Sequence, residues 1–385
     1  MASWLNQLFG TKESAADMDG GVAMDFFRRT FLKALPVMFA VSIVTVGVDP
    51  ANLFRGSSYE RGIATYLAQG RNVAAIGNHD DRLVQSYLTA KLGASPEVVV
   101  LGSSRAMQIR RNVAGGRGLL NASVSEAALE DLEAIAQLYL QLDPQPREVI
   151  VSVDPWDLQE TGWLIGWKTL STERDRILAQ MGRDSGGHWT DRWQALLRYG
   201  QALSPSYFQE SARRLMRALV DESAPRSAYF ATDQTEFDDK PVKLADGSLV
   251  YDAAMRRLSV EAADRSALEY GVKWRDRIDG VSRLEPERQA EFEDFVDYLL
   301  GGGVKVTMYL GPYHPTTYAY FLRERNLRVG GEVEDYLRSM ATARNIEVLG
   351  SYDPARAGVG PEDFFDAQHV RESGVAKIFS QGGGR

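Results

Sequence analysis

The sequence contains no cysteine and only four histidines among its 385 residues. The absence of cysteine excludes disulfide bonds, thiolate metal sites and a cysteine nucleophile. Any histidine-dependent chemistry must therefore use His79, His188, His314 or His369. A chain without cysteine is compatible with the cytoplasm and with a disulfide-free exported location, so this absence does not choose between them.

The chain also lacks an excess of basic residues. Its 44 lysines and arginines stand against 52 aspartates and glutamates, which gives a net charge of −8. Proteins that bind nucleic acid usually carry a basic surface, so this balance argues against a nucleic-acid partner. Hydrophobic residues make up 44% of the chain, which is enough for a large core, and the length suggests two or three domains.

One uncharged apolar run, residues 34–48, lies near the N-terminus. With the three residues before it the run reaches 18 residues, close to the roughly 20 that span a bilayer. Arg28 and Arg29 precede it, and no small-residue cleavage site follows. We therefore expect a cytoplasmic tail (1–30), an uncleaved transmembrane signal anchor (31–54) and an exported remainder. The predicted location is a bacterial inner membrane, with the main domain on the periplasmic or extracytoplasmic side. A buried helix is the alternative.

Beyond this run, short apolar segments alternate with segments of helical periodicity. The apolar segments are rich in valine and isoleucine, which is typical of buried strands. Strands alternating with helices predict an α/β fold with a doubly wound, mostly parallel, five-stranded sheet. The predicted strands are 97–102, 119–124, 148–154, 304–310 and 346–350, and the predicted helices include 125–142, capped by Ser125, 289–300 and 332–344.

Between residues 156 and 283 the strand series stops, and arginine-rich and aspartate-rich helical stretches follow. We predict a helical insertion there, acting as a lid or a side domain. It divides the core into 97–155 and 284–385, and a helical linker (55–96) joins the core to the anchor. Five tryptophans between residues 156 and 193 suit either sugar binding or packing against the sheet.

Two polar motifs follow the first and the last predicted strands. Gly102-Ser103-Ser104-Arg105 comes directly after the first strand, and Asp366 and His369 come after the last. Because the carboxyl ends of parallel strands lie at one edge of the sheet, the two motifs can meet there. Asp366 would then orient the His369 imidazole, which would take the proton of Ser104. The pattern predicts a serine–histidine–aspartate triad, although each motif alone is common as a helix cap or a surface pair.

These motifs resemble the SGNH (GDSL-like) hydrolase superfamily, in which a first block supplies the serine and a late Asp-x-x-His supplies the other two residues. In this alignment Ser103 takes the position of the usual first-block aspartate. Asn121-Ala122-Ser123-Val124-Ser125 resembles the second block, with Ser123 at the glycine. The resemblance implies that the Ser104 and Ser123 N–H groups bind the oxyanion. The third block departs from the pattern, because Trp156 stands where an asparagine is expected; the Trp156 indole N–H or Ser123 would have to replace it.

The Gly-Ser-Ser block and the anchor further resemble a membrane-anchored branch. This branch includes the D-alanyl transfer (DltD) proteins of teichoic-acid modification and the SGNH proteins of polysaccharide O-acetylation. The resemblance implies acyl transfer to or from an envelope glycan without a cofactor, with a multi-pass membrane acyltransferase as partner. Two alternatives stay open: an esterase that releases the acyl group to water, and a non-catalytic scaffold of a polysaccharide-modification complex.

Three further residues have both a functional and a structural interpretation. Arg105 follows the candidate nucleophile and could bind a substrate carboxylate or phosphate, or pair with an aspartate of the protein. His314 follows the fourth predicted strand and could contact substrate, or simply belong to a loop. His79 precedes two aspartates, but without a second histidine or a cysteine nearby we interpret this segment as a turn and predict no metal site.

Overall fold

The computed structural model describes residues 57–382 except 78, 115, 117, 160–163, 185–228, 279–283 and 324–328, together with Arg29, Lys33, Pro36 and Ile43. The described residues from 57 onward belong to one compact unit, which is the unit described below. The predicted tail and anchor lie outside the described residues except for those four positions, as does His188. Among the described residues, no helix is both long and apolar enough to cross a membrane.

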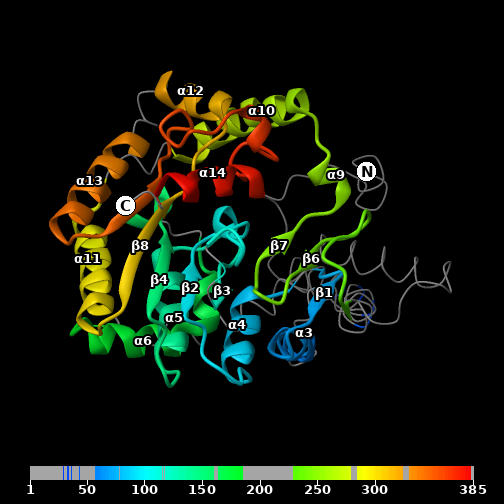
Figure 1. Cartoon of the computed structure of the whole chain (residues 1–385), viewed down its shortest axis with the longest axis vertical. Helices are drawn as coiled ribbons and strands as arrows, with labels where there is room; N and C mark the ends of the chain where they lie inside the picture. Colours follow the sequence, from blue (N-terminus) through cyan, green and yellow to red (C-terminus); the bar gives the residue numbers. More distant parts are fainter. Residues whose placement is uncertain are drawn as a thin grey trace. The chain divides into compact units, whose positions relative to one another are not determined.

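A five-stranded parallel sheet forms the centre of the unit, as predicted (Figure 1). Its order is β3-β2-β4-β8-β9, so the first strand along the chain lies between the second and the third. The carboxyl ends of all five strands therefore share one edge. The strands are β2 (Val98–Leu101), β3 (Leu119–Asn121), β4 (Glu148–Ser152), β8 (Lys305–Leu310) and β9 (Glu347–Gly350).

Helices pack against both faces of this sheet. Alternate strand residues such as Val99 and Val149 face one core, and their neighbours Val100 and Ile150 face the other. The first core includes residues of α3 (Ser58–Ala68), α4 (Asp81–Thr89), α5 (Leu129–Leu140), α11 (Pro286–Gly301) and α13 (Val329–Ala343); the second includes residues of α14 (Glu372–Gly382) and of the segment after β2.

The helix predicted from Ser125 begins later, at Leu129. Ser125 does not cap it, because both its N–H and its hydroxyl donate to Asp81 Oδ2, at 3.0 and 2.9 Å. The Asp131 carboxylate instead accepts the Ala128 N–H at 3.0 Å. The predicted cap is therefore wrong, because a tertiary contact occupies that serine.

A second, antiparallel sheet was not predicted, because the linker and the insertion were expected to be mainly helical, with a polar loop near residues 233–243. Its order is β5-β1-β6-β7, so the linker supplies β1 and the insertion supplies the other three strands. Two or three residues are too few to show a readable alternation of apolar and polar side chains. The strands are β1 (Asn72–Ala74), β5 (Phe230–Thr232), β6 (Val242–Lys243) and β7 (Leu249–Val250).

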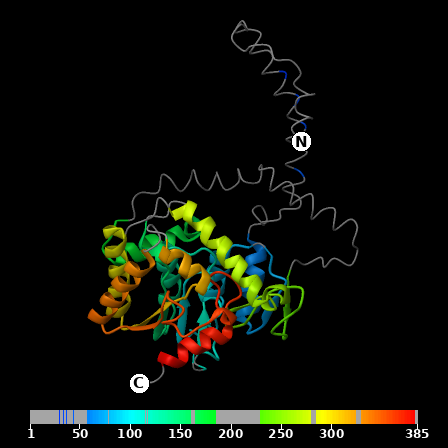
Figure 2. The same cartoon turned by 90° about the horizontal axis from the view of Figure 1, so that it is seen from above.

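The described part of the insertion also contains helices: α6 (Ser171–Gln180), α9 (Ala253–Arg256) and α10 (Val260–Ile278). In Figure 2, α10 runs beside α12 (Pro315–Arg323), the helix that follows β8. The turn between β6 and β7 contacts the main sheet, where the Asn121 N–H donates to the Asp246 carbonyl at 2.7 Å. The insertion thus approaches the carboxyl edge of the main sheet from two directions.

Candidate active site

Ser104 begins a short 3₁₀ helix, η1 (Ser104–Ala106), just after β2 ends. The chain turns at Gly102, where an added Cβ would lie 2.6 Å from the Ser152 Cβ of the neighbouring strand. Only glycine leaves room for so close an approach. Ser103 is buried, and its hydroxyl caps η1 by accepting the Arg105 N–H at 3.2 Å. Of the two serines, Ser104 is the one with exposed surface.

Ser104, His369 and Asp366 form a continuous hydrogen-bonded chain. The Ser104 Oγ lies 2.9 Å from His369 Nε2. On the other side of the ring, His369 Nδ1 lies 2.8 Å from Asp366 Oδ2 and 3.0 Å from Oδ1. This is the arrangement in which a carboxylate orients an imidazole and the imidazole accepts the serine proton.

Asp366 is held as a carboxylate by its surroundings. Burial raises its pKa, but the hydrogen bond and the charge of His369, together with two backbone N–H groups, outweigh burial and lower the pKa below its usual value. Those N–H groups belong to Gln368 and His369 and donate to Oδ1 at 3.0 and 2.9 Å. An ionised Asp366 favours the tautomer with the proton on Nδ1, which leaves the Nε2 lone pair for Ser104.

The expected oxyanion donors are largely engaged elsewhere. The Ser123 N–H donates to Asn121 Oδ1 at 3.0 Å, and the Asn121 amide donates to the carbonyls of Ala106 and Ile109 at 2.8 and 2.9 Å. The Trp156 indole N–H donates to the Ala127 carbonyl at 2.9 Å. The expectation that the Ser123 and Trp156 N–H groups point to substrate does not match these contacts, because each already has an internal acceptor.

Several donors at this edge have no partner within the described chain, among them the Ser104 N–H and the buried hydroxyls of Ser123 and Ser152. Asn121 pairs with Val100, and the Val124 N–H donates to the Gly102 carbonyl at 2.9 Å, so Ser123 lies opposite Gly102. Its side chain shares a sheet face with that of Asn121, which holds the segment after Ser104. The Ser104 N–H and the Ser123 hydroxyl, which stands at the position of the second block, are the candidate oxyanion donors.

Arg105 is an internal residue and is not exposed toward a substrate. Its guanidinium is buried, forms a 2.6 Å ion pair with Asp154 and donates to the Gly311 carbonyl. It also lies 4.0 Å over the Tyr313 ring. Arg105 thus connects the ends of β2, β4 and β8 beneath the serine, and it does not take the substrate-binding role that was one of its two interpretations.

His314 is also internal. Its ring is buried, its Nδ1 accepts the Thr316 N–H at 3.2 Å, and burial lowers its pKa despite nearby carboxylates. The backbone N–H of His314 donates to the Ala367 carbonyl at 2.9 Å. His314 therefore joins the end of β8 to the segment that carries Asp366 and His369, rather than meeting Ser104.

His79 lies in a buried ion cluster. Its Nε2 is 2.9 Å from Asp81 Oδ1, and the Lys243 ammonium lies 3.4 Å from the same oxygen. A lysine therefore occupies the place beside Asp81 where a cation would be expected. No group of three potential metal ligands occurs among the residues that the structure describes.

Two tyrosines of the insertion contact the candidate site and were not predicted. The Tyr251 ring packs edge-on against His369 and Phe365, with centroids 6.2 and 5.1 Å apart. The Tyr270 hydroxyl donates to Gln368 Oε1 at 2.6 Å. Nothing in the local sequence marks either tyrosine, because their partners lie about a hundred residues away along the chain.

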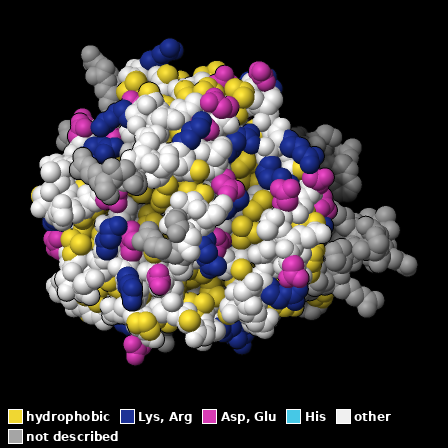
Figure 3. Space-filling model, in the orientation of Figure 1, with side chains coloured by type: hydrophobic (Ala, Val, Ile, Leu, Met, Phe, Trp, Pro, Cys, Tyr) yellow, Lys and Arg dark blue, Asp and Glu magenta, His cyan; other side chains and the backbone are white. Residues whose placement is uncertain are grey.

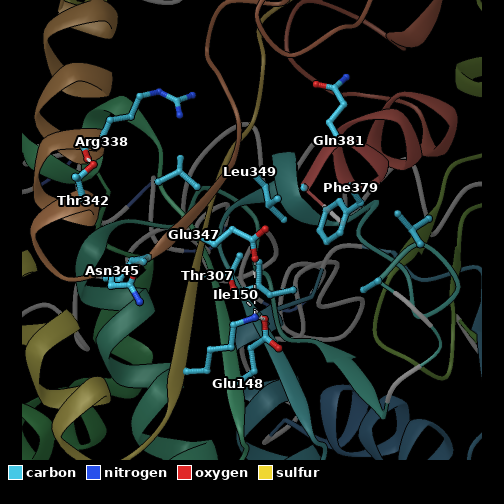
Figure 4. A pocket seen from close by; sticks show the side chains of 16 residues that line it. Glu148, Ile150, Thr307, Arg338, Thr342, Asn345, Glu347, Leu349, Phe379 and Gln381 are labelled. Carbon is cyan, nitrogen blue, oxygen red and sulfur yellow. Dashed lines mark hydrogen bonds and ion pairs between the residues drawn. The ribbon is translucent and has the colours of Figure 1, made fainter. Parts of the chain in front are cut away.

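A large cavity of the described chain lies away from these residues. It is a groove of about 1120 Å³ on one face of the main sheet, near the amino-terminal ends of β4 and β8 (Figure 4). Glu148, Thr307 and Glu347 contribute to its lining, and no serine–histidine pair lies there. On the molecular face drawn in Figure 3, acidic and basic side chains are interspersed rather than segregated. The hydrogen-bonded triad, rather than a cavity or a charged patch, is therefore the feature that indicates the site of chemistry.

Comparison with known protein families and with curated proteins finds no match to this chain.

Proposed function

We propose that the protein is a membrane-anchored, exported serine acyltransferase or esterase of the SGNH type, acting on acyl groups of a cell-envelope polysaccharide. The observation that carries this proposal is the pair of hydrogen bonds that links Ser104, His369 and Asp366. Ser104 Oγ lies 2.9 Å from His369 Nε2, and His369 Nδ1 lies 2.8 Å from Asp366 Oδ2. A serine hydroxyl becomes a useful nucleophile when an oriented base stands within hydrogen-bond reach.

The reaction proceeds in two steps. Ser104 Oγ attacks the acyl carbonyl while His369 takes its proton, and Asp366 stabilises the imidazolium that forms. The Ser104 N–H and the Ser123 hydroxyl stabilise the oxyanion until the C–O bond breaks, and the leaving alcohol takes the proton from His369. Water or a sugar hydroxyl then attacks the acyl carbon while His369 takes its proton, the bond from that carbon to Ser104 Oγ breaks, and Oγ takes the proton back from His369. Neither step needs a cofactor.

Two features of the chain support the SGNH-type fold and the membrane anchor in this proposal. The order of the main sheet is 2-1-3-4-5 in chain sequence, as in flavodoxin-like folds, and the triad lies beyond its carboxyl edge. The apolar run at 34–48 with its preceding arginines supports a single-pass anchor. A multi-pass membrane acyltransferase that delivers acyl groups across the bilayer is the proposed partner, and an envelope glycan is the proposed substrate.

A serine-directed fluorophosphonate probe tests the proposal. We expect the probe to label the wild-type protein and to label neither Ser104→Ala nor His369→Ala above background. Ser103→Ala is the matched control, because its inward-facing hydroxyl caps η1 and does not reach His369. Mass spectrometry of the labelled peptide should place the adduct on Ser104. If labelling were lost in Ser103→Ala and kept in Ser104→Ala, the assignment of the nucleophile would be wrong.

A non-catalytic scaffold is the second candidate, and the engagement of the Trp156 indole N–H by Ala127 favours it. Absence of labelling in purified protein and in intact membranes would support the scaffold. Transfer and hydrolysis differ in the acceptor. Release of free acid from an acyl donor should fall in excess glycan for a transferase and stay constant for an esterase.

A further inference from the structure

The segment that carries Asp366 and His369 is a short hairpin rather than a helix. An antiparallel bridge between Phe364 and Val370 closes it, and the Phe365 N–H donates to the His369 carbonyl at 2.9 Å. Such a small hairpin has little core of its own, so its position depends on its contacts with the rest of the molecule: Phe364 and Val370 are buried in the second core, and its base contacts the insertion. The reach of His369 to Ser104 depends on that position.

Arg371 lies at the base of this hairpin and donates to three backbone carbonyls. Its Nε donates to Phe364 at 2.8 Å, inside the hairpin. Its Nη1 donates to Arg256 and its Nη2 to Leu258, the latter at 3.0 Å, and both acceptors belong to the insertion. The guanidinium also lies 4.7 Å from the centre of the Phe365 ring. One side chain thus joins the hairpin to a segment more than a hundred residues away.

The same stretch of the insertion also contacts the segment that follows the candidate nucleophile Ser104. The Leu249 N–H donates to the Met107 carbonyl at 3.0 Å, and the Gln108 side chain donates to the Leu249 carbonyl at 2.7 Å. Met107 and Gln108 directly follow the helix that begins at Ser104. The stretch 249–258 therefore contacts both the segment after the nucleophile and the hairpin with the base.

We propose that Arg371 is a positioning residue that fixes the His369 hairpin to the insertion, so that the insertion sets the reactivity of Ser104. This inference rests on the proposed function, because it assigns His369 the role of base. A guanidinium presents its N–H groups in a rigid fork and can serve three fixed carbonyls, whereas a lysine ammonium cannot match that geometry. A misplacement of about 1 Å can cost on the order of 10²-fold in rate.

The test uses the full-length protein and compares wild type, Arg371→Lys and Arg371→Ala. We expect both variants to react with the fluorophosphonate about 10- to 100-fold more slowly than wild type at a temperature where each is folded. Free guanidinium at non-denaturing concentration should restore much of the rate of Arg371→Ala, because three carbonyl acceptors are left open. Tetramethylammonium at equal ionic strength should not. Arg257→Ala is the matched control, because Arg257 is exposed and pairs with Asp238 instead of the hairpin.

The pH profile separates positioning from a general loss of folded protein. A loss of folded protein would lower the labelling rate in proportion to the folded fraction, which circular dichroism measures at each pH. A displaced His369 would instead flatten the rise of the rate with pH, and guanidinium would restore the slope. Wild-type rates in both Arg371 variants, or a uniform loss without rescue, would overturn the proposal.

A spectroscopic readout keeps this inference separate from the proposed function. The His369 Nδ1 proton, hydrogen-bonded to Asp366, should give a downfield NMR resonance in the wild type that weakens in Arg371→Ala and returns with guanidinium. If wild type were not labelled while this resonance responded to Arg371, the catalytic proposal would fail and the positioning role would stand. An unchanged resonance would overturn the positioning role whether or not the protein is labelled.

Discussion

At the scale of single residues, the role of a polar side chain depends on whether its hydrogen bonds are already used. Ser103 and Ser104 are adjacent and chemically identical, yet Ser103 caps a helix and Ser104 meets His369. Arg105 and His314 carry suitable groups but are buried in internal contacts. Residue type and spacing predicted the triad, while the structure reassigned most of the supporting residues.

The oxyanion donors are predicted to be the Ser104 N–H and the Ser123 hydroxyl. Removal of one such donor costs about 10²–10³ in rate, so Ser123→Ala should lower the labelling rate constant by that order. Trp156→Phe should change the rate only a few-fold, since its N–H already serves Ala127, and should instead lower the free energy of unfolding by about 1 kcal/mol. Labelling kinetics and urea unfolding of the two variants check this. A large loss of labelling rate in Trp156→Phe with little change in Ser123→Ala would instead indicate that the Trp156 indole N–H is the oxyanion donor.

At the scale of elements, the long core strands were predictable and the short insertion strands were not. β2, β4 and β8 are four to six residues of mostly apolar sequence, buried almost throughout, and each falls within its predicted range. The strands of the second sheet are two or three residues long; β5 and β6 pair with β1, and β7 pairs with β6. Their formation depends on partners rather than on local pattern, so they could not be predicted.

The turn between β6 and β7 positions the second-block residues. Gly247 has a φ of +81°, and a Cβ there would lie 2.1 Å from the Asn121 carbonyl oxygen. Gly70 has a similar φ of +75° with no atom within 4 Å of an added Cβ, so Gly70→Ala isolates the backbone strain, about 1 kcal/mol. Gly247→Ala should cost about 1–3 kcal/mol more and slow the labelling of Ser104. If Gly247→Ala and Gly70→Ala lowered the free energy of unfolding in urea equally, the close contact between the turn and Asn121 would not contribute to stability.

At the scale of the whole molecule, a buried ion cluster joins three parts of the chain. Asp81 at the start of α4 pairs with His79, with Lys243 of β6, and with Ser125 after β3. It thereby connects the linker, the insertion and the core. The pKa of Asp81 lies well below its usual value, because Lys243 and His79 outweigh the effect of burial, so this carboxylate is ionised at neutral pH.

This cluster predicts a pH dependence of stability. Burial lowers the pKa of His79, and the positive charge of Lys243 lowers it as well. The charge and the hydrogen bond of Asp81, together with the hydrogen bond to the Gly77 carbonyl, outweigh both effects and raise this pKa above 6.5. A raised pKa in the folded state stabilises the protein below pH 6.5, and that contribution is lost as the pH rises through the folded-state value. The difference in free energy of unfolding between wild type and His79→Gln should therefore shrink from mildly acidic to mildly alkaline pH. A difference that grows with pH would contradict it.

The sequence by itself determined the α/β order, the five core strands and the two motifs at the carboxyl edge of the sheet. Local apolar runs and residue spacing encode these features, because a strand that is buried on both faces must itself be apolar, and that sequence lies within the strand. Tertiary structure decided which N–H groups are already engaged, which polar side chains are buried in internal contacts, and that Arg371 links the His369 hairpin to the insertion. Those outcomes depend on contacts between residues that are dozens to hundreds of positions apart, and no local pattern specifies them.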